Sequence, residues 1–336
     1  MNISISCQTA PKAPRTRFAL LTVAFAILLG FLPSLLGCAS SAQEPEEDDA
    51  PRIGGALEVD AAATSEVSAT RHQAPLRCNG FEVLCDKPLD HVVFPATHNS
   101  MSHEDGGWWE PNQQHGLTRQ MEDGIRGLLL DSYEFEGELW LCHGLCELGK
   151  QRLADGLAEI EAFLRAHPHE VIILFFQDAV GSEAMSEAIL ESGLSSLAYT
   201  HVTGQAFPTL GEMIASNARL IIASESAGPP PAWYHSGWDL FFDTPYSFQT
   251  IDDFSCSLNR GSIDNPLFLM NHWVSSDVGL PSPEGAAQVN RYDILMARAT
   301  TCFEEYGRVP TLIAVDFYAT GDLFDVVNAL NKAQVP

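Results

Sequence analysis

Short apolar runs alternate with polar and amphipathic stretches from residue 78 to residue 332. Eight runs are rich in aliphatic and aromatic residues: 92–97, 127–131, 139–142, 171–177, 219–223, 239–243, 267–271 and 311–316. Amphipathic stretches separate most of them, such as Leu153, Leu157, Ile160 and Leu164 at helical spacing. This alternation predicts an α/β fold, and the length suits one (β/α)8 TIM barrel. Only a short turn at 136–137 joins the second and third runs, so we expect an irregular barrel.

Polar and reactive residues follow three of these runs directly. His98 and Asn99 follow the first run, Asp131 ends the second, and His143 follows the third. The carboxyl ends of barrel strands converge at one mouth, where β/α barrels carry their active sites. We therefore expect two histidines, a carboxylate and a carboxamide to meet in one cavity.

The first 38 residues have the pattern of an export signal. A basic stretch precedes an almost wholly apolar segment, residues 18–36, which ends in Leu-Leu-Gly-Cys at 35–38. A small residue directly before a cysteine at this place resembles a bacterial lipobox, which predicts lipidation of Cys38. Acyl chains on one cysteine would anchor the protein to a membrane without spanning it. An ordinary signal peptide and an uncleaved anchor are the alternatives.

Residues 39–77 differ in composition from the segments on either side. They are rich in Ala, Ser, Pro and acidic residues and have no periodic apolar face, which predicts a disordered acidic tether. The whole chain has 18 Lys and Arg against 44 Asp and Glu, a formal charge of −26. Such a charge argues against nucleic acid as a partner and against tight docking on a strongly anionic membrane. It would raise the local concentration of divalent cations.

Six cysteines remain after Cys7 and Cys38 are set aside. An even number in an exported domain predicts disulfides, although six cysteines allow about 15 connectivities. Pairing of cysteines close in sequence gives Cys78–Cys85, Cys142–Cys146 and Cys256–Cys302. Zinc binding by Cys142, His143 and Cys146 is an alternative, but the second thiolate pair of a zinc ribbon is missing. A Cys142–Cys146 bridge would stiffen the loop that carries His143.

Three motifs, FPATHNSMS (94–102), GIRGLLLDSYEF (124–135) and LWLCHG (139–144), resemble the phosphatidylinositol-specific phospholipase C X-domain family. The chain looks closest to its single-domain members, and the resemblance extends over nearly everything after residue 77. It implies a PLC-like phosphodiesterase barrel in residues 78–332. It also implies a phosphoric diester hydrolase or lyase that acts on a phospholipid.

The resemblance assigns roles to both histidines. The residue matching His98 is the base that acts on the inositol 2-hydroxyl, and the residue matching His143 protonates the leaving diacylglycerol oxygen. The product would be a cyclic inositol phosphate. Asp316, which closes the last apolar run, could orient His98 through its far ring nitrogen. A hydrogen-bonding residue of the barrel rim is the alternative for Asp316.

Negative charge on the phosphate oxygens also needs a partner, and here the family has two branches. One branch uses an arginine and the other a calcium ion. Asp131 stands where the first branch has its arginine, which favours the metal. Arg126 is a rival for the arginine's role. Arg126 lies an odd number of positions before Asp131, so it should face the other side of the strand.

We expect calcium to be bound by Asn99, Asp131 and Asp178 with waters. Two departures from the family pattern weaken this expectation. Leu129 stands where the calcium branch has another acidic ligand, and Gln177 stands where a glutamate would be expected. Because calcium affinity follows ligand charge, the predicted site would bind the ion loosely.

Further polar residues follow the later strands and could line a pocket for a polyol head group: Glu225, Asp243, Tyr246 and His272. For each one taken alone, a rim residue bonded to the backbone is the blander interpretation. Trp108 and Trp109, beyond the first strand, could stack on substrate or touch lipid, or pack at the base of a loop.

The sequence as a whole predicts an exported phosphodiesterase that is lipid-anchored in a bacterial cell envelope, at the outer membrane or cell surface. Its partners would be a phospholipid or other phosphodiester substrate and the membrane, with no nucleic acid. Two alternatives stay open. The substrate could be another phospholipid or a glycerophosphodiester, or the barrel could be inactive and serve as a surface binding protein.

Overall fold

The centre of the folded unit is one sheet, and most of its strands lie in the predicted apolar runs. The computed structural model describes residues 75–333. Residues 1–38 with Cys38, and the predicted tether as far as residue 74, lie outside the described residues. The strands are β1 Phe94–Thr97, β2 Gly127–Phe135, β3 Glu138–Cys142, β4 Lys150–Arg152, β5 Ile172–Asp178, β6 Leu220–Ser224, β7 Tyr234–Ser236, β8 Phe241–Asp243, β9 Leu267–His272 and β10 Leu312–Val315.

Eight of these strands run parallel, in the order β7-β6-β5-β2-β1-β10-β9-β8. β1 lies inside the sheet, where Ala96 pairs with Ala314 of β10 and with Gly127 of β2. This curled parallel sheet with helices around it confirms the predicted α/β barrel-like fold. Within the described residues the end strands β7 and β8 do not pair with each other, so the barrel is incomplete.

The run 139–142 is not a barrel strand, contrary to the sequence prediction. It forms β3, which pairs antiparallel with the end of β2. The turn between them has positive φ at both Glu136 and Gly137, which is typical of a type I′ hairpin. The eighth parallel strand is β7 instead. It has three residues and follows three prolines, so it was too short to recognise as an apolar run.

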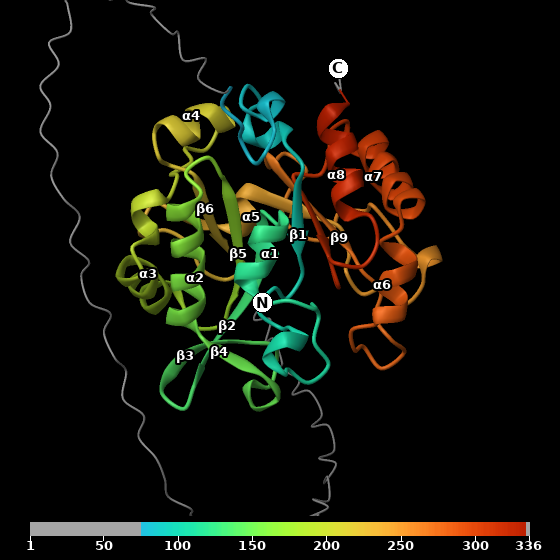
Figure 1. Cartoon of the computed structure of the whole chain (residues 1–336), viewed down its shortest axis with the longest axis horizontal. Helices are drawn as coiled ribbons and strands as arrows, with labels where there is room; N and C mark the ends of the chain where they lie inside the picture. Colours follow the sequence, from blue (N-terminus) through green and yellow to red (C-terminus); the bar gives the residue numbers. More distant parts are fainter. Residues whose placement is uncertain (1–74, 334–336) are drawn as a thin grey trace, which may run out of the picture. The chain divides into compact units, whose positions relative to one another are not determined.

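Helices pack along both flanks of the sheet. They are α1 Leu117–Asp123, α2 Leu153–Ala166, α3 Ser182–Glu191, α4 Leu210–Ala215, α5 Gly237–Leu240, α6 Pro283–Val289, α7 Tyr292–Tyr306 and α8 Leu323–Lys332. Figure 1 shows α2 and α3 on one flank and α7 and α8 on the other. The apolar residues predicted at helical spacing in 153–164 are buried in α2. Among residues 75–333, no helix combines the length and apolarity needed to cross a membrane.

Side chains of the parallel strands alternate between two faces of the sheet, as the pleat requires. The inner face points into the barrel, and its core includes Ala96, Phe175, Leu269 and Ala314, with Leu129 packed against them. The outer face points to the helices, and its core includes Leu128, Leu130, Phe176, Met270 and Val315. The face to which a residue belongs therefore follows from its position in the strand.

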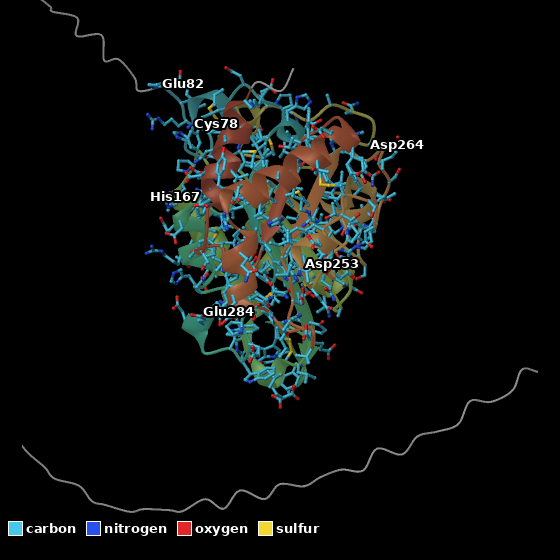
Figure 2. All side chains as sticks on the ribbon, turned by 90° about the vertical axis from the view of Figure 1, so that its right-hand side faces the viewer. Cys78, Glu82, His167, Asp253, Asp264 and Glu284 are labelled. Carbon is cyan, nitrogen blue, oxygen red and sulfur yellow. A yellow bond between two sulfur atoms is a disulfide. The ribbon has the colours of Figure 1, made fainter. Side chains whose placement is uncertain are left out.

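The three predicted disulfides are confirmed. Cys78–Cys85 closes a loop before β1, and Figure 2 shows Cys78 at the end of the folded unit away from Glu284. Cys142–Cys146 encloses His143, and Cys256–Cys302 ties the loop after β8 to α7. Disulfides of this kind persist in oxidising compartments, which supports export of the protein.

Candidate active site

The inner face at the carboxyl edge of the sheet collects most of the predicted catalytic residues. Because side chains alternate with period two, the residues two positions after Ala96, Leu129 and Ala314 also face inward. These residues are His98, Asp131 and Asp316. Together with His143 they line a cavity of about 830 Å³, which we call the mouth cavity.

The His98 ring is held at its edge and on one face. Nδ1 lies 2.8 Å from Oδ1 of Asp316, whose side chain is 3% exposed. Trp273 stacks flat on the ring, with the centroids 3.8 Å apart and 5° between the planes. Asn112 donates from its amide to the same Asp316 oxygen at 3.1 Å. Nε2 has no partner within residues 75–333, so it is the nitrogen free to act on a substrate.

Backbone strain flanks both members of this pair. Asn99, directly after His98, has φ of 45°, and Phe317, directly after Asp316, has φ of 49°. Asparagine tolerates the left-handed region, whereas a bulky aromatic residue rarely adopts it. The Phe317 N–H donates to the Asn112 carbonyl at 2.7 Å, which helps to hold this conformation. Such strain persists only where surrounding contacts fix it, and it concentrates at functional sites.

His143 reaches the mouth cavity from the β3 hairpin. It directly follows Cys142 and lies within the turn that the Cys142–Cys146 disulfide closes. The centroids of the His98 and His143 rings are 6.5 Å apart, so both can contact one phosphodiester group. His143 stays exposed to solvent at the rim of the cavity, but the protein around it displaces part of the water near the ring. This desolvation, followed by the nearby His98, lowers the pKa of His143, and Asp316 opposes the shift.

Asp131 is a buried carboxylate that faces the mouth cavity. It is 5% exposed, and no hydrogen bond to its side chain occurs in the described part of the chain. Burial raises its pKa to about 7, with His98 acting in the opposite direction and Glu225 adding to the rise. An unpartnered, buried carboxylate directed at a cavity is a candidate for binding a cation or a hydroxyl group.

Two carboxamides complete the possible donor set for a cation. Asn99 uses its side-chain N–H on Asn112 Oδ1 at 3.2 Å, which leaves its own oxygen free, and Gln177 also lines the cavity. No cluster of three or more His, Cys, Asp or Glu side chains suited to a metal ion occurs in residues 75–333. One carboxylate and two carboxamides fit a loosely held calcium ion that keeps several waters.

A second, deeper cavity of about 140 Å³ continues from the mouth cavity toward the inner core. The two cavities share His98, Asp131 and Trp273. Leu129 and Leu269 line the deeper part. We call this space the deep cavity, and its position beside His98 suits the head group of a substrate.

Arg260 lines the deep cavity and is a positively charged residue that the sequence pattern did not predict there. Its Nη1 lies 2.6 Å from Glu225 Oε1, and its Nη2 lies 2.6 Å from Asp243 Oδ2. The guanidinium lies between the Trp238 and Tyr246 rings, 4.2 and 4.7 Å from their centroids. Two carboxylates thus neutralise this cation. Of the predicted polyol residues, Glu225 and Tyr246 line the deep cavity.

Asp178 does not reach either cavity, contrary to the predicted metal site. It lies one residue after the inward-facing Gln177 and therefore belongs to the outer face. Oδ1 accepts hydrogen bonds from the backbone N–H groups of Val180 and Gly181, at 2.8 and 2.9 Å. Oδ2 accepts from the Tyr234 hydroxyl at 2.8 Å. With both oxygens engaged, Asp178 stabilises the turn after β5.

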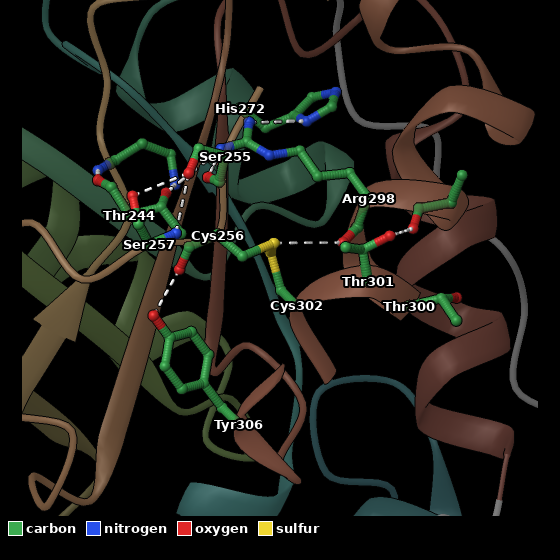
Figure 3. Close-up of a disulfide and its surroundings, with 12 residues drawn as sticks. Thr244, Ser255, Cys256, Ser257, His272, Arg298, Thr300, Thr301, Cys302 and Tyr306 are labelled. Atoms are coloured by element: carbon green, nitrogen blue, oxygen red, sulfur yellow. Dashed lines mark hydrogen bonds between the residues drawn. A yellow bond between two sulfur atoms is a disulfide. The ribbon is translucent and has the colours of Figure 1, made fainter. Parts of the chain in front are cut away.

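His272 is also absent from the predicted polyol pocket. It is fully buried on the outer face, where Nε2 donates to the Val289 carbonyl at 2.9 Å. Nδ1 accepts from Arg298 Nη1 at 3.3 Å, a contact drawn in Figure 3 beside the Cys256–Cys302 disulfide. Burial and then the neighbouring Arg298 lower the pKa of His272 to about 3, so it is neutral in the fold.

Asp243 lies behind the deep cavity and does not line it. Its carboxylate is 1% exposed and binds Arg260 and, at 3.0 Å, the amide of Asn271. The prediction that it contacts a polyol is wrong for this reason. Arg126 faces the outer side as predicted, where it binds Glu170 at 2.7 Å.

Sequence reasoning missed three residues beside His98 and the deep cavity: Asn112, Arg260 and Trp273. The spacing could have found Trp273, because it lies four residues after the inner-face Leu269 and so falls on the same face. Asn112 and Arg260 belong to long loops with no periodic pattern. Only the folded chain brings them to the cavities.

The protein has relatives in a fungus and a plant. It is 26% identical to a protein of Arthroderma benhamiae named PI-PLC X domain-containing protein 1, over 80% of this chain and 94% of that one. An uncharacterized secreted protein of the same fungus is also 26% identical, over 76% of this chain and 64% of that one. A PI-PLC X domain-containing protein of Arabidopsis thaliana is 26% identical, over 73% and 62%. The chain thus spans less than two thirds of two of these relatives.

Two solved bacterial structures are similar in fold. The phosphatidylinositol-specific phospholipase C of Listeria monocytogenes superposes with a TM-score of 0.51 at 18% identity, over 74% of this chain and 94% of that one. A Staphylococcus aureus phosphatidylinositol-specific phospholipase C gives a TM-score of 0.51 at 17% identity, over 74% and 95%. At these identities the likeness shows the fold alone.

The sequence itself decides the family. Residues 84–331 match the family model PI-PLC_X, described as PI-PLC X 1. This range contains every strand of the sheet and both histidines of the mouth cavity. The match covers well over half of the chain, so the protein belongs to the PI-PLC X-domain family.

Proposed function

We propose that the protein is a phosphodiesterase that cleaves the head group of a phosphatidylinositol-like phospholipid by acid–base catalysis. One observation carries the proposal. The rings of His98 and His143 face one cavity with 6.5 Å between their centroids, and a buried carboxylate holds the far nitrogen of His98. Family membership and the shared fold support the same chemistry.

His98 acts as the base in this mechanism. Asp316 accepts a hydrogen bond from Nδ1–H, so Nε2 carries the lone pair and takes the proton of the inositol 2-hydroxyl. The freed oxygen attacks phosphorus, and the bond from phosphorus to the diacylglycerol oxygen breaks. His143 gives its proton to that leaving oxygen. The products are a cyclic inositol phosphate and diacylglycerol, and proton return from His98 to His143 through solvent restores the site.

Asn99 and Asp131 are the residues that would hold calcium, with Gln177 as a neutral third donor. The bound ion would supply positive charge for the non-bridging phosphate oxygens. The side-chain oxygens of Asn99 and Asp131 line the cavity beside His98 and have no protein partner in the described residues. Without Asp178 the site has a single carboxylate, so we expect weak binding of the ion.

A second substrate class is another phospholipid or a glycerophosphodiester. The neutralised charge of Arg260, together with the formal charge of −26, favours it over a strongly anionic head group. An inactive barrel that serves as a surface binding protein is the third alternative. Leu129 and Gln177, which stand where acidic ligands were expected, favour it.

We also propose that the protein is exported, lipid-anchored through Cys38 and held in a bacterial cell envelope. The disulfides support export, as does a relative described as secreted. Exposed apolar side chains on two loops would meet the lipid. Trp109 is 55% exposed and Leu145 is 63% exposed. The backbone N–H of Trp109 donates to the Leu148 carbonyl at 2.9 Å, so the loop that carries Trp109 and the loop that carries Leu145 lie side by side.

Hydrolysis of phosphatidylinositol vesicles tests the proposal. The purified chain should release a cyclic inositol phosphate, and a chelator should reduce the rate if Asn99 and Asp131 bind calcium. Activity that ignores the chelator would remove the metal and keep the histidine pair. Release of a head group from phosphatidylcholine or a glycerophosphodiester, with no release from phosphatidylinositol, would favour the second substrate class. No turnover of any of these would leave the inactive barrel.

A further inference from the structure

The strand register places an aromatic residue beside the proposed base. Thr97 of β1 pairs with Val315 of β10, and Val315 pairs with His272 of β9. The next residue of each strand is therefore side by side with the others at the carboxyl edge: His98, Asp316 and Trp273. Asp316 meets the edge of the His98 ring and Trp273 covers its face.

We infer that Trp273 is a positioning residue, whose indole fixes the plane of the His98 ring and so directs Nε2 into the mouth cavity. The inference rests on the proposed role of His98 as the base. A hydrogen bond from Nδ1 to Asp316 restrains one atom of the ring but permits it to swing about that contact. A parallel stack with 3.8 Å between centroids and 5° between planes removes that freedom.

Trp273 is itself held rigidly. It is 5% exposed and belongs to the inner core. Tyr246 lies alongside it, with 6.5 Å between the ring centroids and 27° between the planes. Tyr246 in turn covers the Arg260 guanidinium, which two carboxylates hold in place. The stack that fixes His98 is therefore anchored in the charged wall of the deep cavity.

The chemistry of an indole suits this position. Its face carries negative electrostatic potential, which attracts the imidazolium that His98 becomes when it takes the substrate proton. An aliphatic side chain would fill the same space without this attraction and without a flat surface for the ring. Misplacement of a reacting group by about 1 Å can cost roughly 10²-fold in rate.

Trp273 could instead be a core residue with no effect on the orientation of His98. Three variants distinguish this role from the positioning role. Trp273→Leu removes the flat ring, and Trp273→Phe keeps an aromatic face. Trp233→Leu is the matched control, because Trp233 packs against the outer core and lines neither cavity. Each would be compared in stability, in the NMR signals of the His98 ring, and in kcat and KM with phosphatidylinositol vesicles.

We expect the carbon-bound ring protons of His98, assigned with His98→Gln, to resonate upfield in the native protein because the indole lies against them. In Trp273→Leu they should move downfield, and kcat should fall roughly 10- to 100-fold with a smaller change in KM. Trp273→Phe should restore most of the upfield shift and most of kcat. Trp233→Leu should leave the His98 signals and kcat near their native values, even if the variant is less stable.

Unchanged His98 signals in Trp273→Leu would overturn the inference, as would a kcat loss shared equally by Trp233→Leu. The NMR comparison needs no turnover, so it tests the stack of Trp273 on His98 even if phosphatidylinositol is not a substrate, and the fall in kcat tests the positioning role. A native rate in His98→Gln would instead contradict the proposed function, whatever the ring signals show.

Discussion

At the carboxyl edge of the sheet, the inner face and the outer face carry the same residue types in different states. Within the described residues, the Asp131 carboxylate on the inner face accepts no hydrogen bond, whereas the Asp178 carboxylate on the outer face accepts four. His143 borders the mouth cavity, whereas His272 is fully buried with both ring nitrogens engaged. In these two pairs, free polar atoms mark the residues that border the cavity, and satisfied ones mark the residues that hold the fold together.

The end of a strand is therefore not by itself a site. The next residue along a strand points to the other face, so a shift of one position separates a ligand from a structural group. Gln177 and Asp178 illustrate it, since the glutamine takes the cavity position and the aspartate the structural one.

The largest expected effect comes from substituting one histidine of each face. His143→Ala should lower kcat about 10²- to 10⁴-fold, because the leaving oxygen loses its proton donor. Its free energy of unfolding should change little, since the ring borders solvent. His272→Ala should do the reverse, with a loss of about 2–4 kcal/mol because Arg298 and the Val289 carbonyl lose their partner.

Turnover of phosphatidylinositol and urea unfolding would be measured on both histidine variants. Rates per folded molecule would be compared, so that instability of His272→Ala does not imitate a catalytic defect. Should His272→Ala lose as much kcat as His143→Ala, the division between the two faces would be wrong.

The second effect concerns the buried carboxylates. The pKa of Asp131 is raised to about 7, above its unfolded value, so the folded protein binds the proton more tightly and loses stability as pH rises toward 7. In a chelator, Asp131→Asn should therefore raise the free energy of unfolding at pH 8 by about 1–3 kcal/mol, with little change at pH 4. The same variant should lose phosphodiesterase activity.

Asp178→Asn is the matched variant on the outer face. Replacing its charge weakens the hydrogen bonds to Val180 and Gly181, so it should lower stability by about 1–2 kcal/mol and keep most activity per folded molecule. A stabilised, inactive Asp131→Asn beside a destabilised, active Asp178→Asn would support the division of roles between the two faces. Two variants that are equally destabilised would contradict it.

The third effect is a pH dependence. As the acid, His143 must carry its proton in the free enzyme, and partial desolvation of its ring, followed by the nearby His98, lowers its pKa. On the alkaline side, kcat/KM should therefore begin to fall below about pH 6.5, the ordinary pKa of histidine. Above that point it should fall by up to roughly tenfold for each pH unit. Initial rates between pH 4.5 and 8.5 at constant ionic strength would locate it. An alkaline limb above pH 7.5 would refute the assigned role of His143.

Much of this arrangement could be predicted from local pattern. The apolar runs predict most of the strands. The ends of those runs, together with the alternation of side chains between two faces, place His98, Asp131 and Asp316 at the cavity. The same alternation would have excluded Asp178 and His272 from the cavity, because each lies an odd number of positions from an inner-face residue of its strand. The three disulfides follow from pairing each cysteine with the nearest one in sequence.

The rest depends on long-range packing that no local pattern encodes. β3 is an exception: it is as apolar as a barrel strand, but the tight turn at 136–137 is a local signal, and it makes β3 an antiparallel partner of β2. Arg260 lies in an irregular loop and reaches the deep cavity because Asp243 and Glu225 bind it. Asn112 reaches Asp316 across 204 positions of the chain. Such contacts require the tertiary fold.

The smallest expected effect concerns the loop that holds His143 at the inner face. The sequence separation of Cys142 and Cys146 is four, so the bridge restricts the unfolded chain less than one that closes a longer loop, and the double Ser variant should lose no more than about 2 kcal/mol. It should lower kcat roughly 3- to 10-fold, because the freed loop holds the acid less precisely. The double Ser variant of Cys78 and Cys85, which lie before β1 and line neither cavity, is the control. Equal kcat in both variants would mean that the hairpin alone positions His143.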